Sequence, residues 1–254
     1  MASTPRAFIG WKALAAALAA AGCLGSPALA APEWVRNALS LGRDSQLHAT
    51  PTVARFIIQE GGAFVLDRSR NPALLKFDDS SEIWAVQSSR GPRGDILFKD
   101  DVGDTLLRAT KLGGMTVFTE RRPEGSAAAL VGASTPLKII PMGAAGLYQR
   151  LVLASLHCTH AAHHLVSFEV PDADAHSAPV IGDAISLAAE AIITLAGRPS
   201  GRAATARVDK VVVTTGARPA ALFQRGALVI VVVPAQGLAG HPSSVRIEQA
   251  IVGG

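Results

Sequence analysis

Cysteine is scarce in this chain of 254 residues, which has only Cys23 and Cys158. Cys23 lies in an N-terminal segment that we expect to be removed, for the reasons given below. The mature chain would then have one thiol and no disulfide within it. The fold must therefore rest on its hydrophobic core, and a chain of this length with 49% hydrophobic residues is able to bury one.

The sequence also lacks a block of lysine and arginine of the kind that follows a nucleic-acid backbone. Lys and Arg total 24 against 20 Asp and Glu. Two of the basic residues, Arg6 and Lys12, are lost with the expected leader, which leaves the mature chain close to neutral. The remaining basic pairs, such as Arg121-Arg122, stand alone in Gly/Pro-rich segments. We therefore expect no nucleic-acid partner.

No common catalytic motif is present either. The sequence contains no Gly-x-Ser-x-Gly, Ser-x-x-Lys, Gly-x-Gly-x-x-Gly or phosphate-binding loop, so the usual hydrolase, dinucleotide and phosphate-loop mechanisms lose their sequence support. A catalytic triad assembled from distant residues leaves no such motif, because it is recognised by geometry. A hydrolase with a dispersed active site near His48, His176 or His241 therefore stays open as an alternative.

The N-terminus has the features of a secretory signal peptide. Basic residues precede an apolar run, Ala13–Leu24, that is too short to span a bilayer, and Ala28-Leu29-Ala30 supplies the small residues that a signal peptidase reads. We expect residues 1–30 to be removed after Ala30 and the product to be periplasmic or secreted. The imperfect lipobox Ala20-Ala21-Gly22-Cys23 offers a second route, in which a lipidated Cys23 anchors the protein in a membrane.

Residues 31–120 are expected to form a β-rich half. Seven short segments rich in β-branched, aromatic and aliphatic residues alternate with Gly, Pro, Asn and Asp turns, at a spacing of about ten residues. This pattern predicts an antiparallel meander, either open or closed into a small barrel. The expected strands are Val53–Gln59, Phe64–Arg68, Leu74–Phe77, Glu82–Gln87, Asp95–Lys99, Thr105–Thr110 and Met115–Thr119.

A Gly/Ala/Pro-rich stretch, residues 121–136, is expected to connect this half to a mixed α/β half over residues 137–254. Apolar residues at intervals of three and four predict helices there, and runs of valine and isoleucine predict buried strands. The predicted fold class is therefore α+β. The expected elements are a helix over 144–163, a strand over 165–170, a helix over 179–196, strands over 206–215, 220–223 and 227–233, and a helix over 242–251.

Several short segments resemble a family of uncharacterised secreted proteins from alphaproteobacteria. They are Phe64-Val65-Leu66-Asp67-Arg68, Arg90-Gly91-Pro92-Arg93-Gly94-Asp95, Asp101-Val102-Gly103, Leu107-Arg108-Ala109-Thr110, 112–119 and 234–240. The resemblance covers most of the mature chain, from about Val53 to Ile251. It implies an exported bacterial protein and carries over no activity, because the family is uncharacterised.

Four of the seven histidines lie within eight residues, His157-Cys158-Thr159-His160-Ala161-Ala162-His163-His164. On a helix, His157, His160 and His164 fall within a sector of about 60°, and His160 and His164 have the i, i+4 spacing of a chelating pair. These three histidines form a candidate metal site for zinc or copper. An ordinary solvated or interface face is the favoured interpretation, because metal sites need supporting partners that a sequence does not show.

Three acidic residues, Asp100, Asp101 and Asp104, lie with Gly103 on a predicted turn. They offer ligands for a cation, but the loop lacks the alternating oxygen donors and distal Glu of a calcium-binding loop. A hairpin turn with solvated carboxylates is the favoured interpretation. The triplet Arg93-Gly94-Asp95 is likewise interpreted as turn chemistry.

Three classes of function remain after these exclusions. The favoured one is a non-enzymatic envelope or secreted protein that binds an unknown protein or small-molecule partner through its β half. The second is a periplasmic metal-binding protein that uses His157, His160 and His164. The third is the hydrolase with a dispersed active site. The sequence establishes no cofactor, and it implies contact with a membrane only if Cys23 is lipidated.

Overall fold

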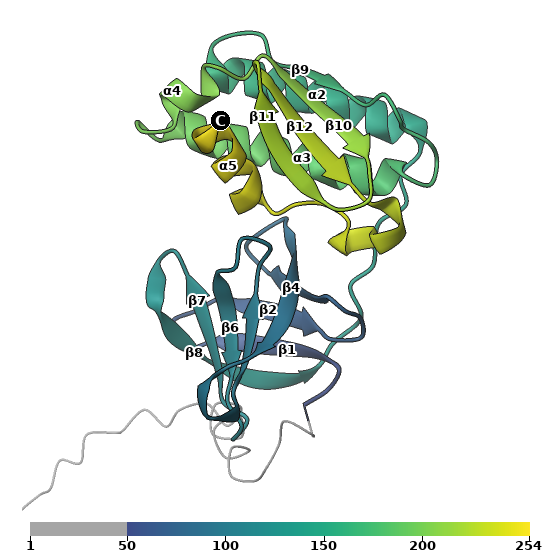
Figure 1. The fold of residues 1–254 in the computed structure, drawn as a ribbon. Coiled ribbons are helices and arrows are strands. Elements are labelled where there is room, and N and C mark those ends of the chain that lie inside the picture. The colour runs from purple at the N-terminus through teal and green to yellow at the C-terminus, as the bar shows by residue number, and fades with distance from the viewer. Residues whose placement is uncertain (1–49) are drawn as a thin grey trace, which may run out of the picture.

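The computed structural model describes residues 50–254. The expected signal peptide, its cleavage site near Ala30, the lipidation site Cys23 and also His48 lie outside the described residues. Two halves follow each other along the chain, a closed β-barrel and a four-stranded sheet with helices (Figure 1).

Each strand of the barrel pairs antiparallel with the next, and the eighth strand closes the ring on the first. The predicted antiparallel meander is thus confirmed in its closed form, and all seven predicted strands are present close to their expected ends. The strands are β1 (Val53–Ile58), β2 (Ala63–Asp67), β3 (Ala73–Phe77), β4 (Ile83–Arg90), β5 (Ile96–Lys99), β6 (Thr105–Ala109), β7 (Met115–Thr119) and β8 (Arg122–Ala133).

β8 occupies most of the stretch that was predicted as a connection, so that prediction is wrong for residues 122–133. It pairs with β7 on one side and with β1 on the other, and it therefore closes the barrel. Its alanines and glycines lack the bulk that usually marks a strand, which explains the error. At Gly125 the small size is needed for close packing, because a Cβ there would lie 2.6 Å from Thr116 Cγ2 and 2.8 Å from Phe118 Cε1.

Large side chains fill the barrel interior. Phe56 and Phe64 stack with ring centroids 5.1 Å apart, and Phe77 packs on Phe64 at 5.8 Å. An eight-stranded barrel is just wide enough for its own side chains to fill it. The barrel is therefore a packed core, made of the buried residues Ala54, Phe56, Phe64, Leu66, Ala73, Leu75, Val86, Phe98, Leu107, Ala109, Met115 and Val117.

The second half contains a sheet in the order β11-β12-β10-β9, in which β9, β10 and β12 run parallel and β11 is an antiparallel edge. The α+β class is thus confirmed, and the short elements α4 and η2 were not predicted. The elements are α2 (Ala144–Ala162), β9 (Ser167–Glu169), α3 (Ala178–Gly197), α4 (Arg202–Thr205), β10 (Lys210–Thr215), β11 (Ala220–Gln224), β12 (Ala227–Val232), η2 (Pro234–Ala239) and α5 (Ser244–Gly253).

α3 is the central helix of this half and contacts both α2 and α5 (Figure 1). By length and composition it is able to cross a membrane, but 61% of its most apolar window is buried inside the protein. We therefore interpret α3 as the core helix of a globular unit. α2 lies toward β9 and α5 toward β11, so both edges of the sheet have a helix nearby.

Candidate functional site

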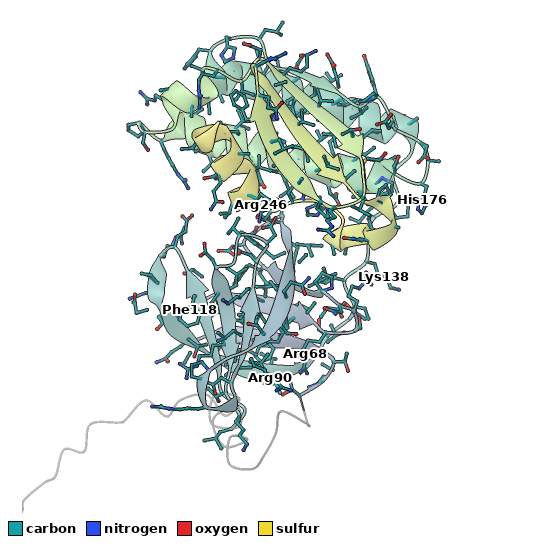
Figure 2. The ribbon with its side chains drawn as sticks, in the orientation of Figure 1. Arg68, Arg90, Phe118, Lys138, His176 and Arg246 are labelled. Atoms are coloured by element: carbon teal, nitrogen blue, oxygen red, sulfur yellow. The ribbon has the colours of Figure 1, made fainter. Side chains whose placement is uncertain are left out.

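One end of the barrel contacts the helices of the second half through its turns. In the β3–β4 turn, the Ser81 hydroxyl donates to the carboxylate of Glu190 on α3 at 3.0 Å. In the β7–β8 turn, Glu120 lies 3.8 Å from Arg198. The largest group of hydrogen bonds between the two described halves is at the start of α5, where Arg246 lies at their junction (Figure 2).

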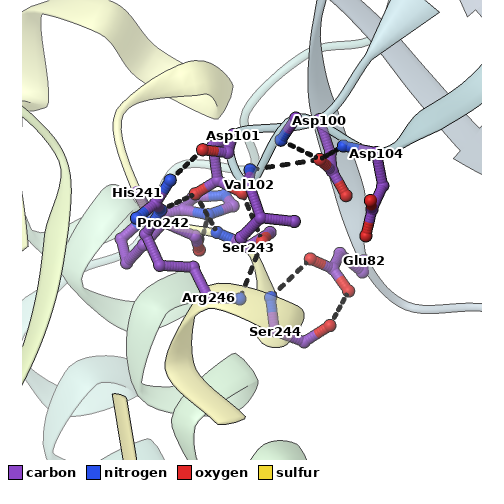
Figure 3. A network of polar contacts seen from close by, with 11 residues as sticks. Glu82, Asp100, Asp101, Val102, Asp104, His241, Pro242, Ser243, Ser244 and Arg246 are labelled. Carbon is purple, nitrogen blue, oxygen red and sulfur yellow. Dashed lines mark hydrogen bonds and ion pairs between the residues drawn. The ribbon is translucent and has the colours of Figure 1, made fainter. Parts of the chain in front are cut away.

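Two barrel carboxylates bind the N-terminus of α5 (Figure 3). Asp101 accepts hydrogen bonds from the N–H of Ser243 at 3.1 Å, from its hydroxyl, and from Nε of Arg246 at 3.0 Å. Glu82 accepts from the N–H of Ser244 at 2.9 Å and from its hydroxyl at 2.6 Å. The first N–H groups of a helix lack partners within the helix and carry partial positive charge, which favours carboxylates there. We call these five residues the α5 clamp.

Glu82 is the most strongly perturbed acid of the α5 clamp. It is only 5% exposed, and this burial raises its pKa to about 7 although the bonds from Ser244 lower it. The nearby charges of Glu190 and Asp101 raise the pKa further. When Glu82 is protonated, its own hydrogen is available to the Ser244 hydroxyl, so the contact exists in both states but is less costly in the neutral one.

Asp100 shapes the β5–β6 turn from which Asp101 reaches α5. One oxygen of Asp100 accepts from the N–H groups of Val102, Gly103 and Asp104 at 3.1, 2.9 and 2.8 Å. The predicted turn is confirmed, but the prediction of solvated carboxylates is wrong for the buried Asp100 and for Asp101, which is bound to α5. In residues 50–254 no three His, Cys, Asp or Glu side chains form a group able to hold a metal.

His241 is buried just before the α5 clamp. Burial lowers its pKa, while the Pro242 carbonyl and the charges of Asp183 and Asp101 act in the opposite direction. Its Nδ1 lies 3.1 Å from the Pro242 oxygen, and in the described part of the chain no hydroxyl or thiol is hydrogen-bonded to the ring. A hydrolase with a Ser or Cys nucleophile needs that nucleophile next to such a base, so His241 gives this form of the alternative no support. The other described candidate, His176, is exposed.

The histidine cluster divides where α2 ends. The helix stops at Ala162, and His163 has a left-handed backbone with φ 59, so His164 does not share the helix with His157 and His160. The His164 ring lies 3.0 Å from the Ala162 oxygen and 2.8 Å from the Val208 oxygen, and these carbonyls raise its pKa. The helical spacing expected for His164 is therefore wrong, and a metal role for the three histidines stays a prediction.

Cys158 is fully buried on α2. Its sulfur lies 4.0 Å from the Ala189 oxygen, and burial raises the pKa of the thiol to about 12. Because the thiolate is the reactive form, we expect Cys158 to resist iodoacetamide at pH 8 in the folded protein and to react after unfolding in urea. Mass spectrometry of the peptide that contains Cys158 measures this. Rapid alkylation of the native protein would contradict its burial.

Apolar side chains gather on the outer side of α2, beside β9. Tyr148, Val152 and Leu156 recur every four residues and are 68%, 47% and 60% exposed, and Leu165 beyond the helix is 73% exposed. Residues four apart lie on the same side of a helix, so the three form a continuous stripe. Contiguous apolar patches of this kind are uncommon on soluble proteins and often mark interaction surfaces.

Two adjoining hollows run along this stripe. The larger, of about 480 Å³, lies between α2 and β9, and the smaller, of about 250 Å³, continues toward the start of α2. Within residues 50–254, the larger hollow is lined by no carboxylate, histidine, lysine, arginine or thiol, and its polar side chains are the hydroxyls of Tyr148, Ser155, Thr159 and Ser167. Two of its hydroxyls are already engaged, since Ser155 donates to the Val166 oxygen at 2.6 Å and Thr159 accepts from the Val166 N–H at 3.0 Å. We call the stripe, Leu165 and the two hollows the α2 groove.

Neither the α5 clamp nor the α2 groove was predicted from the sequence. A signal for the groove is present, because Tyr148, Val152 and Leu156 widen the apolar side of α2 beyond what one packed face needs. For the clamp the local signal is Ser243, a favoured residue before a helix, but its partner Asp101 is 142 residues away.

Comparison with known proteins places the chain in one family. No curated protein and no solved structure matches it. Residues 35–251 match the family described as a domain of unknown function, DUF4908, and this span includes both the barrel and most of the second half. The chain therefore belongs to the DUF4908 family, a domain of unknown function.

Proposed function

We propose that the protein is an exported, non-enzymatic binding protein of the bacterial envelope and that it takes its partner at the α2 groove. The observation that supports this most is the exposure of Tyr148, Val152, Leu156 and Leu165 together over two apolar hollows. Removing apolar surface from water contributes about 25 cal/mol per Å². A complex in which a partner covers these side chains is therefore stabilised relative to the free protein.

The chemistry of the groove favours binding over catalysis. Among the described residues, the larger hollow is lined by no carboxylate, histidine, lysine, arginine or thiol, and two of its hydroxyls, on Ser155 and Thr159, are bonded to Val166. The barrel interior is filled by its own side chains, so the groove is a better candidate than the β half that the sequence favoured. Export rests on the signal-peptide features of residues 1–30 and on the resemblance to secreted proteins.

Site-specific photo-cross-linking in the source bacterium tests this proposal. A photoreactive amino acid replaces Val152 in the groove or, as a matched control, the exposed His157, which lies about 140° around the same helix from Val152. We expect a cross-linked product in the envelope fraction from position 152 and none from position 157. Products from both positions, or from neither, would contradict a binding role for the groove.

A further inference from the structure

We propose that the partner in the α2 groove is an extended apolar polypeptide segment that adds a strand to the free edge of β9. This inference rests on the proposed function, because it names the occupant of the same groove. It is drawn from the backbone of β9, which forms one wall of the larger hollow through Ser167 and Phe168.

Within residues 50–254, β9 lies at the edge of the sheet and pairs with β10 alone. Ser167 donates its N–H to the Asp209 oxygen at 3.0 Å, which fixes the direction of the backbone groups. In a parallel pair, alternate residues direct their N–H and C=O groups toward the neighbouring strand. The groups of Ser167 and Glu169 therefore point at β10. The residues whose groups point away from β10 are Val166, Phe168 and Val170.

α2 already occupies one end of this edge. Thr159 and Ser155 take the N–H and C=O of Val166, so the outward groups of that residue are satisfied. For Phe168, the next outward residue, no hydrogen bond on this side is present within residues 50–254. The backbone N–H and C=O of Phe168 thus face the hollow, next to the apolar stripe of α2.

This pair of groups discriminates between possible occupants. A helix, a lipid chain or an apolar small molecule would cover the N–H and C=O of Phe168 without bonding them, at a cost of about 1–3 kcal/mol per group. An extended segment bonds to them and places its alternate side chains against Tyr148 and Leu156. The segment is expected to be uncharged there, because none of the described residues that line the larger hollow is charged and Glu169 is already paired with Lys210 at 3.0 Å.

A second copy of this chain is a poorer occupant. Self-pairing of two β9 strands about Phe168 would run each strand past Val166 of the other copy, where the side chains of Ser155 and Thr159 lie. A segment from another protein has no such symmetry and is free to enter from the Val170 end. We therefore assign the groove to a different polypeptide.

The test uses random dodecapeptides selected on the purified protein, followed by two measurements on the peptides that bind. We expect the selected peptides to have apolar residues at alternate positions. We expect their affinity for the protein to fall by about tenfold when the residues facing β9 are N-methylated, because each lost hydrogen bond contributes about that much to binding. We also expect the peptide to slow hydrogen exchange at the amide of Phe168. Leu156→Asp should abolish binding, and Leu153→Asp, at a similarly exposed position outside the groove, should not.

Each other outcome overturns the inference. Binding that tolerates N-methylation and leaves the exchange of Phe168 unchanged would show an occupant held by side chains alone. Protection of Phe168 that rises with protein concentration, without peptide, would show a second copy. Failure to select any peptide that depends on Leu156 would also overturn it, whereas the proposed function is judged separately by the cross-linking from position 152.

Discussion

Glu82→Gln is expected to raise the free energy of unfolding by about 3 kcal/mol at pH 8 and to leave it nearly unchanged at pH 4. Burial raises the pKa of Glu82 to about 7 in the folded protein, from the usual 4.5 of an exposed glutamate in the unfolded chain. The folded state therefore prefers the protonated form, and stability is lost as the pH rises from 4.5 to 7. Glutamine has no proton to lose and keeps both contacts with Ser244.

Urea unfolding of both proteins between pH 4 and pH 8 measures this effect. The informative quantity is the difference between their free energies of unfolding, since other titrating groups cancel in it. Glu60→Gln, in the exposed turn between β1 and β2, makes the same change of charge. We expect the free energy of unfolding of this control to stay within about 0.5 kcal/mol of that of the unsubstituted protein at every pH. A difference for Glu82→Gln that does not change with pH would contradict a buried, titrating carboxyl group.

Asp101→Ala is expected to lower the free energy of unfolding by about 3 kcal/mol at pH 7. The substitution removes the acceptor for the Ser243 N–H, the Ser243 hydroxyl and Nε of Arg246. Hydrogen bonds to a charged group contribute about 1.5–3 kcal/mol each, but water replaces part of this because the Asp101 side chain is 31% exposed. The loss should therefore be well below the sum of three such bonds.

Asp104→Ala is the matched control for Asp101, because it removes a carboxylate from the same turn. Asp104 is exposed, and its bond within the turn is made by its backbone N–H, which donates to Asp100 and is kept by the substitution. We expect a change below about 0.5 kcal/mol. Equal losses for the two variants in urea unfolding at pH 7 would show that Asp101 acts on the turn and not on α5.

The β-rich half was largely predictable because each strand is bounded by its own turn chemistry. β8 escaped prediction because Gly125 and its alanine neighbours are small, and their strand conformation is set by packing against β1 and β7. Closure of the barrel is likewise a contact between the first and last strands, which a local pattern does not report.

The candidate sites were harder to predict than the fold. The end of α2 at Ala162 carries no glycine or asparagine signal, since His163 itself takes the left-handed conformation. His164 was therefore placed on the helix by periodicity alone. The α5 clamp joins residues from the two halves of the described chain, so burial of Glu82 and its raised pKa follow from tertiary structure.

The most direct test of binding at the α2 groove is the yield of product cross-linked from position 152 when a nearby leucine is replaced by aspartate. Leu156 and Leu153 are similarly exposed, at 60% and 52%, but only Leu156 lines the larger hollow. We expect Leu156→Asp to reduce the yield by about tenfold or more, because it places a charge in an apolar contact, and Leu153→Asp to leave it near the original level. Equal yields from the two variants would contradict binding through the apolar stripe of α2.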